Sequence, residues 1–396
     1  MIGISKLYCG TVEASDPLRY GRRSEELPSH LLQFSKDKKP VIVWNITSKC
    51  NLRCLHCYAS AKPHEKEMST NEGLSLITEL KDYGVPVILF SGGEPTLRED
   101  LPTLADAAVK AGIRAVISSN GTLITQDMAM RLSDLGLSYV GISLDGMEKV
   151  NDSFRGVTGA FKGAMEGIYN VMMADIKVGL RFTINKQNYK EISNIFDLMT
   201  TEGIKRACFY HLVYTGRAKE LIDEDLSHDQ TRQTVDLIID RTSSMIEKGI
   251  NAEVLTVDNH ADGPYIYLRM KKEGNSRAEE VLKLLKMNQG NSTGLGIGCV
   301  SWDGTVYPDQ FWRNHPLGNI LERPFSKIWD DPENDFLMKL KDKKEYVKGR
   351  CQRCRWLDVC AGNFRARAEA ATDNPWGEDP ACYLSDEEIG EGGASE

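Results

Sequence analysis

The sequence lacks the features that mark membrane, secreted or nucleic-acid-binding proteins. No apolar run approaches the roughly 18 residues that a membrane span needs. The first residues contain no basic segment followed by an apolar one, so no signal peptide is expected. Acidic residues outnumber basic residues by 57 to 49, and the net charge of −8 argues against a general binder of nucleic acid or membrane surfaces. We therefore expect a cytoplasmic protein with no nucleic-acid or membrane partner.

Internal repeats are also absent, and low complexity is confined to the final EEIGEGGASE, which we expect to be disordered. The 396 residues are 41% hydrophobic and 27% charged, an ordinary globular balance. A chain of this length can bury a large core and corresponds to about two to three domains.

Short apolar runs alternate with helical patterns from residue 41 onward. The runs are rich in Val, Ile and Phe and nearly continuous in apolar character, which is typical of strands buried on both faces. Between them lie amphipathic segments, the first of which begins at Ser69 with Glu72 completing a capping box. Six such units predict an α/β fold with a parallel sheet, either an open partial barrel or a doubly wound sheet. The expected strands are 41–47, 85–91, 114–119, 139–144, 178–184 and 206–212.

The pattern changes after about residue 215. Residues 227–249 and 275–288 are expected to be helical, with a loop-rich stretch between them. Residues 299–311 predict a hairpin that turns at Asp303–Gly304. The expected organisation is an N-terminal extension (1–40), a barrel (41–220), a helical connecting region (221–290) and a small metal-stabilised domain with a disordered tail (291–396).

Ten cysteines carry most of the functional information, and seven of them form two groups. Cys50, Cys54 and Cys57 follow the first strand in a Cys-x3-Cys-x2-Cys pattern. Three thiolates on one loop can bind three irons of a cubane cluster and leave the fourth iron open to a ligand. Zinc is the alternative, with His56 as an additional ligand.

The second group has four cysteines near the C-terminus, with spacings of two, five and 21 residues between them. Four thiolates can close a metal site completely, either as a zinc knuckle or around an iron–sulfur cluster. Cys9, Cys208 and Cys299 remain, and free cysteine is a common core residue. The four grouped cysteines are Cys351, Cys354, Cys360 and Cys382.

The first cysteine motif, followed by Gly92-Gly93-Glu94-Pro95 at the end of the second strand, resembles the radical S-adenosylmethionine (SAM) superfamily. This resemblance implies a 4Fe–4S cluster on the three cysteines, SAM bound to its open iron, and a partial (β/α)6 barrel. Polar residues at the ends of the next strands match the SAM-contacting segments of that family, where ligands bind in parallel sheets. The implied SAM-binding residues are Gly92, Gly93, Glu94, Ser119, Asn120, Ser143, Asp145 and Arg155, with Arg181 and Asn185 as weaker candidates.

The second cysteine group resembles the SPASM or shortened Twitch domain, which ligates an auxiliary 4Fe–4S cluster. The chain departs from the full SPASM pattern, because Phe364 and Asp309 occupy positions where that family often has cysteine. We therefore expect one auxiliary cluster and two 4Fe–4S clusters in all. Cys299 could be a ligand by exchange, a thiol at the substrate site or a buried structural residue.

Several segments resemble the haem-biosynthesis branch of the superfamily: YHLVYTGR (210–217), PDQFW (308–312) and the run from residue 349 to 388. The resemblance implies removal of acetate side chains from 12,18-didecarboxysiroheme to give Fe-coproporphyrin III. NirJ-type haem d1 biosynthesis and decarboxylation of Fe-coproporphyrin III are the alternatives within this branch. Peptide modification is less expected, because residues 1–40 are short for a peptide-recognition module. The non-enzyme alternative is a scaffold that binds an iron–sulfur cluster or zinc.

An iron tetrapyrrole with several carboxylates requires an apolar slot with a cationic rim. His211 or His315 could face its iron. For each of these side chains, an ordinary core or surface role is the alternative. The chemistry also requires a low-potential electron donor, for which we expect ferredoxin or flavodoxin. The rim candidates are Arg217, Arg313, Arg365 and Arg367, the wall candidates are Tyr214, Phe311 and Trp312, and Cys299 is the candidate thiol.

Overall fold

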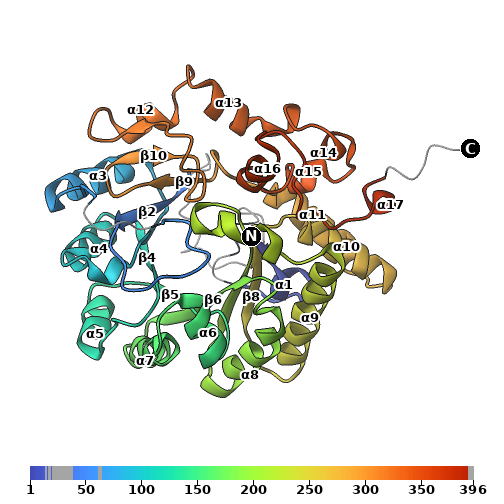
Figure 1. The fold of residues 1–396 in the computed structure, drawn as a ribbon, viewed down its shortest axis with the longest axis horizontal. Helices are drawn as coiled ribbons and strands as arrows, with labels where there is room; N and C mark the ends of the chain where they lie inside the picture. Colours follow the sequence, from blue (N-terminus) through green and yellow to red (C-terminus); the bar gives the residue numbers. More distant parts are fainter. Residues whose placement is uncertain (14–15, 17–18, 20–38, 61–64, 391–396) are drawn as a thin grey trace, which may run out of the picture.

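The computed structural model describes residues 1–13, 16, 19, 39–60 and 65–390. Eleven strands of the described residues form one sheet in the order β1-β8-β7-β6-β5-β4-β3-β2-β9-β10-β11 (Figure 1). Strands β2 to β8 are parallel to one another and follow the chain order, as in a (β/α) barrel. Their bounds are β2 Val41–Thr47, β3 Val87–Gly92, β4 Arg114–Ser119, β5 Tyr139–Ser143, β6 Lys177–Ile184, β7 Arg206–His211 and β8 Glu253–Val257.

The six predicted strands correspond to β2 through β7 and are confirmed. The seventh parallel strand, β8, lies in the region that the sequence predicted to be helical and loop-rich, so that prediction was wrong there. Its five residues, EVLTV, are buried, but the run is short and begins with a charged residue, which made it indistinguishable from a loop. The helix α10 (Asp262–Lys272) follows β8 and was not predicted from the sequence either.

Helices cover the outer face of the sheet (Figure 1). The predicted capping box is present at α3, where the Ser69 side chain accepts from the backbone N–H of Glu72 and the Glu72 side chain accepts from that of Ser69. This exchange satisfies two of the N–H groups that a helix start leaves unpaired. The other long helices are α4 Leu101–Lys110, α5 Gln126–Asp134, α6 Glu148–Arg155, α7 Ala160–Met173, α8 Ile192–Glu202, α9 His228–Glu247 and α11 Ala278–Asn288.

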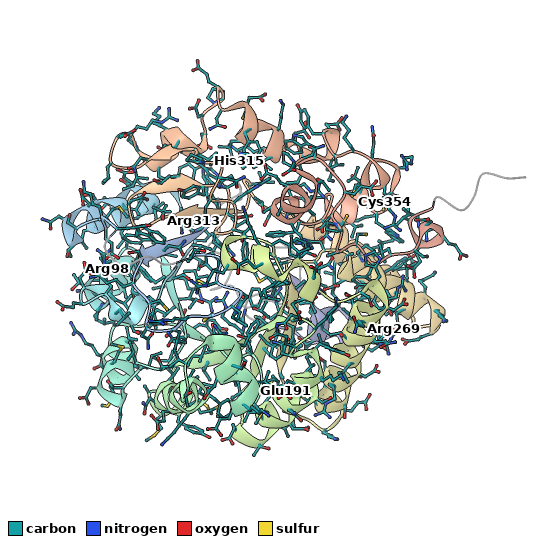
Figure 2. All side chains as sticks on the ribbon, viewed as in Figure 1. Arg98, Glu191, Arg269, Arg313, His315 and Cys354 are labelled. Carbon is teal, nitrogen blue, oxygen red and sulfur yellow. The ribbon has the colours of Figure 1, made fainter. Side chains whose placement is uncertain are left out.

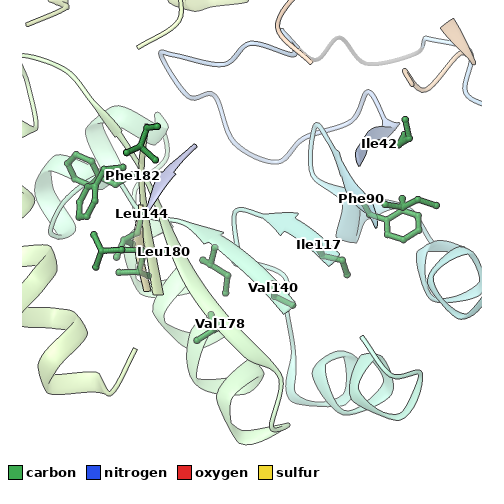
Figure 3. Close-up of a cluster of buried hydrophobic side chains, with 14 of the residues drawn as sticks. Ile42, Phe90, Ile117, Val140, Leu144, Val178, Leu180 and Phe182 are labelled. Carbon is green, nitrogen blue, oxygen red and sulfur yellow. The ribbon is translucent and has the colours of Figure 1, made fainter. Parts of the chain in front are cut away.

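The main core lies between the sheet and these helices. Side chains of a strand alternate between its two faces, so every second residue points outward to the helices. Ile42, Phe90, Ile117 and Val140 occupy such positions and are fully buried (Figure 3). The opposite face encloses the barrel interior, where residues such as Val43 form separate small clusters. Because the main core lies between the sheet and the helices, polar groups can occupy the barrel interior.

Both ends of the chain extend the same sheet. The predicted hairpin is confirmed as β9 (Ile297–Val300) and β10 (Thr305–Tyr307), and β9 pairs in parallel with β2. At the other edge, β1 (Ile2–Gly3) pairs antiparallel with β8. The parallel strands follow the chain order without the reversal of a doubly wound sheet, which favours the partial barrel. None of the helices in the described residues is long and apolar enough to cross a membrane.

The C-terminal region consists mainly of short helices after the hairpin and the two-residue strand β11 (Gly318–Asn319). It packs along one side of the barrel (Figure 1). The longest of these helices, α16, spans Arg365–Thr372. The others are α12 Phe325–Trp329, α13 Asp335–Lys341, α14 Arg350–Arg353, α15 Leu357–Cys360 and α17 Asp386–Ile389.

Candidate functional site

A cavity opens at the carboxyl ends of the parallel strands, where the sequence predicted the site. The three cysteines of the first group all line it. Most of the predicted SAM-binding residues line it too, so the structure brings together groups that lie between Cys50 and Arg181 in the chain. These residues are Gly92, Gly93, Ser119, Asn120, Ser143 and Arg155, together with the weaker candidate Arg181.

The cysteine loop between β2 and α3 is held by its backbone. The N–H groups of Arg53 and Leu55 donate to the carbonyls of Arg155 and Phe154 at the end of α6, each at 3.0 Å. The loop thus rests on the helix that follows β5. Because backbone bonds fix the loop, the cysteine side chains are free to serve as ligands.

Arg217 holds the same loop from the other side. Its Nε donates to the carbonyl of Cys54 at 2.8 Å, and its backbone N–H donates to the carbonyl of Cys57 at 3.0 Å. The sequence placed Arg217 on the rim for substrate carboxylates, and the structure instead uses it to position the cysteine loop.

Gly92 and Gly93 allow the end of β3 to approach the start of the cysteine loop. A Cβ on Gly93 would lie 2.1 Å from the carbonyl oxygen of Lys49, and a Cβ on Gly92 would lie 2.5 Å from that of Thr47. Gly92 also has φ +133°, which disfavours other residues. The close approach that these glycines permit is therefore to the protein backbone.

Glu94 is fully buried behind the cavity wall. Its carboxylate accepts from Ser119 Oγ at 2.7 Å, from the backbone N–H of Asn120 at 2.7 Å and from Thr96 Oγ1 at 2.6 Å. It thus ties the ends of β3 and β4 together. Sequence reasoning expected Glu94 to bind SAM, and its contacts within the chain make it an organiser of the wall.

Arg155 connects the cysteine loop to a buried carboxylate. Its Nη1 lies 3.6 Å from Cys54 Sγ, and its Nη2 pairs with Asp145. Asp145 is fully buried and also accepts from the backbone N–H of Thr183 at 2.7 Å. Burial opposes the charge of Arg155, yet Asp145 and Cys54 raise its pKa above the usual range. Asp145 therefore positions Arg155 from beneath and does not line the cavity itself.

The far wall of the cavity carries polar groups from β6 to β8, of which sequence reasoning named Arg181 and His211 and missed Asp258. Arg181 Nη2 donates to the Tyr210 hydroxyl, and His211 lines the cavity beside them. Asp258 follows β8 with φ +65°, and its Oδ2 has no partner among the described residues. Burial raises the pKa of Asp258 to about 7. The sequence signal for Asp258 was its position as a polar residue directly after an apolar run. It was overlooked because strand β8 was not predicted.

A second cavity is lined by all four cysteines of the C-terminal group. N–H groups point at two of the sulfurs: the backbone N–H of Trp356 lies 3.4 Å from Cys354 Sγ, and Arg350 Nη1 lies 3.6 Å from Cys382 Sγ. Burial and the neighbouring cysteines raise the pKa of Cys360. Four thiols around one cavity fit a cluster with four protein ligands, whereas the first cavity supplies three.

Two arginines that were predicted for the substrate rim lie in the core of this C-terminal region. Arg367 is fully buried and pairs with Asp379 through Nε and Nη2, each at 2.8 Å. Its Nη1 donates to the carbonyl of Leu212 at 3.0 Å, which ties α16 to the end of β7. Arg365 is also fully buried and donates to backbone carbonyls, including that of Gly377 at 2.5 Å. Both predictions are corrected, because neither side chain reaches a surface that a ligand could touch.

Three further substrate candidates lie outside the cavity lining. Trp312 is buried and its Nε1 donates to Glu369, and His315 Nε2 lies 2.7 Å from the same carboxylate. Arg313 stacks on the ring of Trp302, with its guanidinium carbon 4.1 Å from the ring centroid. Figure 2 shows Arg313 and His315 in the hairpin region, away from Cys354. These contacts give the three residues packing roles in place of the predicted substrate contact.

Cys299 and Tyr214 are also buried. The Asn45 amide donates to Cys299 Sγ at 3.5 Å, and Cys299 packs against Val43 inside the barrel. Of the three roles left open for Cys299, the buried structural one matches this position. The hydroxyl of Tyr214 donates to Asp225 at 2.5 Å. Phe311, by contrast, does line the cavity, as predicted for a wall residue.

Comparisons with known proteins agree with this arrangement. Residues 44–199 match the radical SAM superfamily, and residues 296–355 match the SPASM iron–sulfur cluster-binding domain. Over 395 residues the chain is 62% identical to Fe-coproporphyrin III synthase of Methanosarcina barkeri, covering 98% of this chain and 99% of that protein. It is 38% identical over 358 residues to pre-heme d1 synthase of Dinoroseobacter shibae, covering 89% and 88%.

A solved structure shares the fold. anSMEcpe with bound AdoMet and the Cp18Cys peptide superimposes with a TM-score of 0.68 at 20% identity, covering 89% of this chain and 96% of that one. The likeness supports a partial barrel followed by a small C-terminal cluster domain.

Proposed function

Because the chain belongs to the haem-biosynthesis branch of the radical SAM superfamily, we propose that it removes acetate side chains from 12,18-didecarboxysiroheme to give Fe-coproporphyrin III. Its radical SAM and SPASM domains assign it two 4Fe–4S clusters and SAM as cofactors. The observation that carries the proposal is the 62% identity, over nearly the whole of both chains, to a protein whose name states this product.

The two cavities fit these cofactors. Cys50, Cys54 and Cys57 would hold the cluster that leaves one iron open, and the C-terminal cysteines would hold the closed one. When bound, the open cluster and SAM supply a 5′-deoxyadenosyl radical that abstracts hydrogen from the substrate. The chain itself supplies the position of the ligands.

The residues around the cysteine loop orient the cofactor. Arg155 Nη1 donates toward Cys54 Sγ, and hydrogen bonds to sulfur stabilise the more reduced, more negative cluster. Ser119, Asn120 and Ser143 present polar groups along the same wall, where the amino acid and ribose of SAM would bind. Glu94 and Asp145 keep that wall rigid from behind.

The opposite side of the cavity suits the flat apolar ring system of a tetrapyrrole. Leu212, Val213 and Phe311 line it, and the Phe311 ring packs edge-on against Tyr58 at 5.2 Å between ring centroids. Arg181 is the cation on this side, and we propose that it meets a substrate carboxylate. This assignment replaces the buried Arg365 and Arg367. A low-potential donor such as ferredoxin or flavodoxin would deliver the electron that starts the reaction.

The proposal is tested by incubating the anaerobically reconstituted protein with 12,18-didecarboxysiroheme, SAM and dithionite. We expect a tetrapyrrole with the mass of Fe-coproporphyrin III, together with 5′-deoxyadenosine. Cys54→Ala is the control that should form neither product. Unchanged substrate alongside vigorous SAM cleavage would reject the proposal. A product of a different mass would favour the pre-heme d1 reaction, and conversion of added Fe-coproporphyrin III would favour its decarboxylation.

A further inference from the structure

A chain of three buried side chains joins the catalytic cavity to the auxiliary one. His211, at the end of β7, lines the catalytic cavity, and Tyr383, next to Cys382, lines the auxiliary cavity. Asp262 lies between them and is fully buried at the start of α10. Its Oδ2 is 3.0 Å from His211 Nε2, and its Oδ1 accepts from the Tyr383 hydroxyl at 2.6 Å.

This network determines which histidine nitrogen carries hydrogen. Burial alone would raise the pKa of Asp262, but His211 and the hydrogen bond from the Tyr383 hydroxyl lower it, so the carboxylate is ionised. Its position in the first turn of α10 also favours the negative charge. An ionised carboxylate can only accept, so His211 Nε2–H donates to it. In the neutral imidazole the lone pair then lies on Nδ1.

The Nδ1 atom has no hydrogen-bond partner among the residues that the structure describes. A lone pair at a cavity wall can bind a hydrogen donor or a metal ion, but it repels a carboxylate. Histidines that bind metals usually donate their other N–H to a carboxylate, which orients the ring and makes the free nitrogen more basic. His211 and Asp262 form that pair, and Leu212 and Val213 provide an apolar surface beside it.

We infer that His211 Nδ1 is the axial ligand of the substrate iron, with Asp262 and Tyr383 as positioning residues. The inference rests on the proposed function, since it requires that the substrate be an iron tetrapyrrole. Coordination at one face would fix the distance and tilt of the macrocycle relative to the SAM side of the cavity. The peripheral acetate groups would then be presented to the radical in a defined position.

The test is nitrogen hyperfine spectroscopy of ferric Fe-coproporphyrin III bound to the holoprotein with both clusters oxidised. We expect a coupling from one protein nitrogen that changes when histidine is labelled with 15N. His211→Ala should abolish this coupling, and added imidazole should restore it. The matched control is His315→Ala, because His315 lies outside the cavity and bonds to Glu369. Asp262→Asn should keep the coupling but weaken tetrapyrrole binding by about 10-fold or more.

Each outcome decides the question. Absence of a histidine coupling in the labelled wild type, or its persistence in His211→Ala, would overturn the assignment. If His211→Ala fails to fold, which its iron content would reveal, the absence of a histidine coupling in the labelled wild type still overturns the assignment. Turnover of didecarboxysiroheme without a histidine coupling would reject the ligand and leave the proposed function intact. Failure of the wild type to bind or convert any iron tetrapyrrole would reject the proposed function itself.

Discussion

Each cysteine site lies beside a buried arginine–aspartate pair, and the two pairs make different contacts. Beneath the catalytic site, Arg155 pairs with Asp145 and directs its other nitrogen at Cys54 Sγ. Beneath the auxiliary site, Arg367 pairs with Asp379 and directs its other nitrogen at a backbone carbonyl of the barrel. The first pair brings positive charge to a proposed cluster ligand, whereas the second fastens the C-terminal region to β7. From this comparison we expect a nearby positive charge to shift the reduction potential of the catalytic cluster. The auxiliary cluster depends instead on how the C-terminal region packs against the barrel.

Removing one cysteine from each site should give the largest contrast. Cys54→Ala deletes one of three ligands, so we expect 5′-deoxyadenosine formation to fall to background. Cys360→Ala deletes one of four auxiliary ligands, so SAM cleavage should persist while tetrapyrrole conversion falls. Iron analysis and chromatography of 5′-deoxyadenosine measure both effects. Cys9→Ala, which lies in neither group, should retain both clusters. Loss of both clusters in Cys360→Ala would contradict the expectation that the catalytic cluster forms without the auxiliary one.

A methyl group at Gly93 should damage the catalytic site selectively. The added Cβ would lie 2.1 Å from the Lys49 carbonyl oxygen and would push the cysteine loop away from β3. We expect Gly93→Ala to lose most SAM cleavage while keeping the auxiliary cluster. In Gly112→Ala the Cβ meets nothing within 4 Å, and the positive φ of +79° should cost only about 1 kcal/mol of stability. Equal SAM cleavage by the two variants would show that this close approach is dispensable.

Neutralising the two buried aspartates should separate the effect of charge on SAM cleavage from the effect of packing on stability. Asp145→Asn and Asp379→Asn each leave a buried arginine without its counter-charge, which costs about 3–5 kcal/mol of unfolding free energy. Denaturant titration of the reconstituted protein measures that loss. Only Asp145→Asn should also impair SAM cleavage in the fraction that remains folded. The exposed partner of Arg350 provides the control, since Asp386→Asn should change stability by less than about 1 kcal/mol. A matching loss of SAM cleavage in Asp379→Asn would remove the distinction between the pairs.

The smallest effect should come from Arg350. Its Nη1 lies 3.6 Å from Cys382 Sγ, the same distance that separates Arg155 from Cys54 Sγ. Arg350 is partly exposed, with 21% of its side chain accessible, so water screens its charge. We expect Arg350→Gln to shift the reduction potential of the auxiliary cluster only slightly in a redox titration. A large shift would mean that the auxiliary cluster is tuned by charge as well.

The parts of the site that could be predicted from sequence are those encoded locally. The cysteine spacings and the polar residues that directly follow apolar runs are short patterns, and parallel strands bring their ends together by topology. Glu94 shows where this reasoning stopped: the motif was recognised, but its role depended on Ser119 and Asn120 from the next strand.

The substrate residues could not be predicted in the same way. Arg365 and Arg367 are charged, so a surface position was the reasonable expectation, and only the fold shows that their partners bury them. Asp258 escaped notice because β8 itself was missed. Long-range partners such as the Asp262 of His211, 51 residues away, leave no trace in a local pattern.

The central claim is that the two cysteine sites together serve the removal of acetate from an iron tetrapyrrole. Mass spectrometry of the tetrapyrrole after anaerobic turnover with didecarboxysiroheme tests it most directly. The predicted result is conversion to the mass of Fe-coproporphyrin III by the wild type and none by Cys54→Ala. Recovery of intact didecarboxysiroheme from a wild-type reaction that has consumed SAM would contradict the claim.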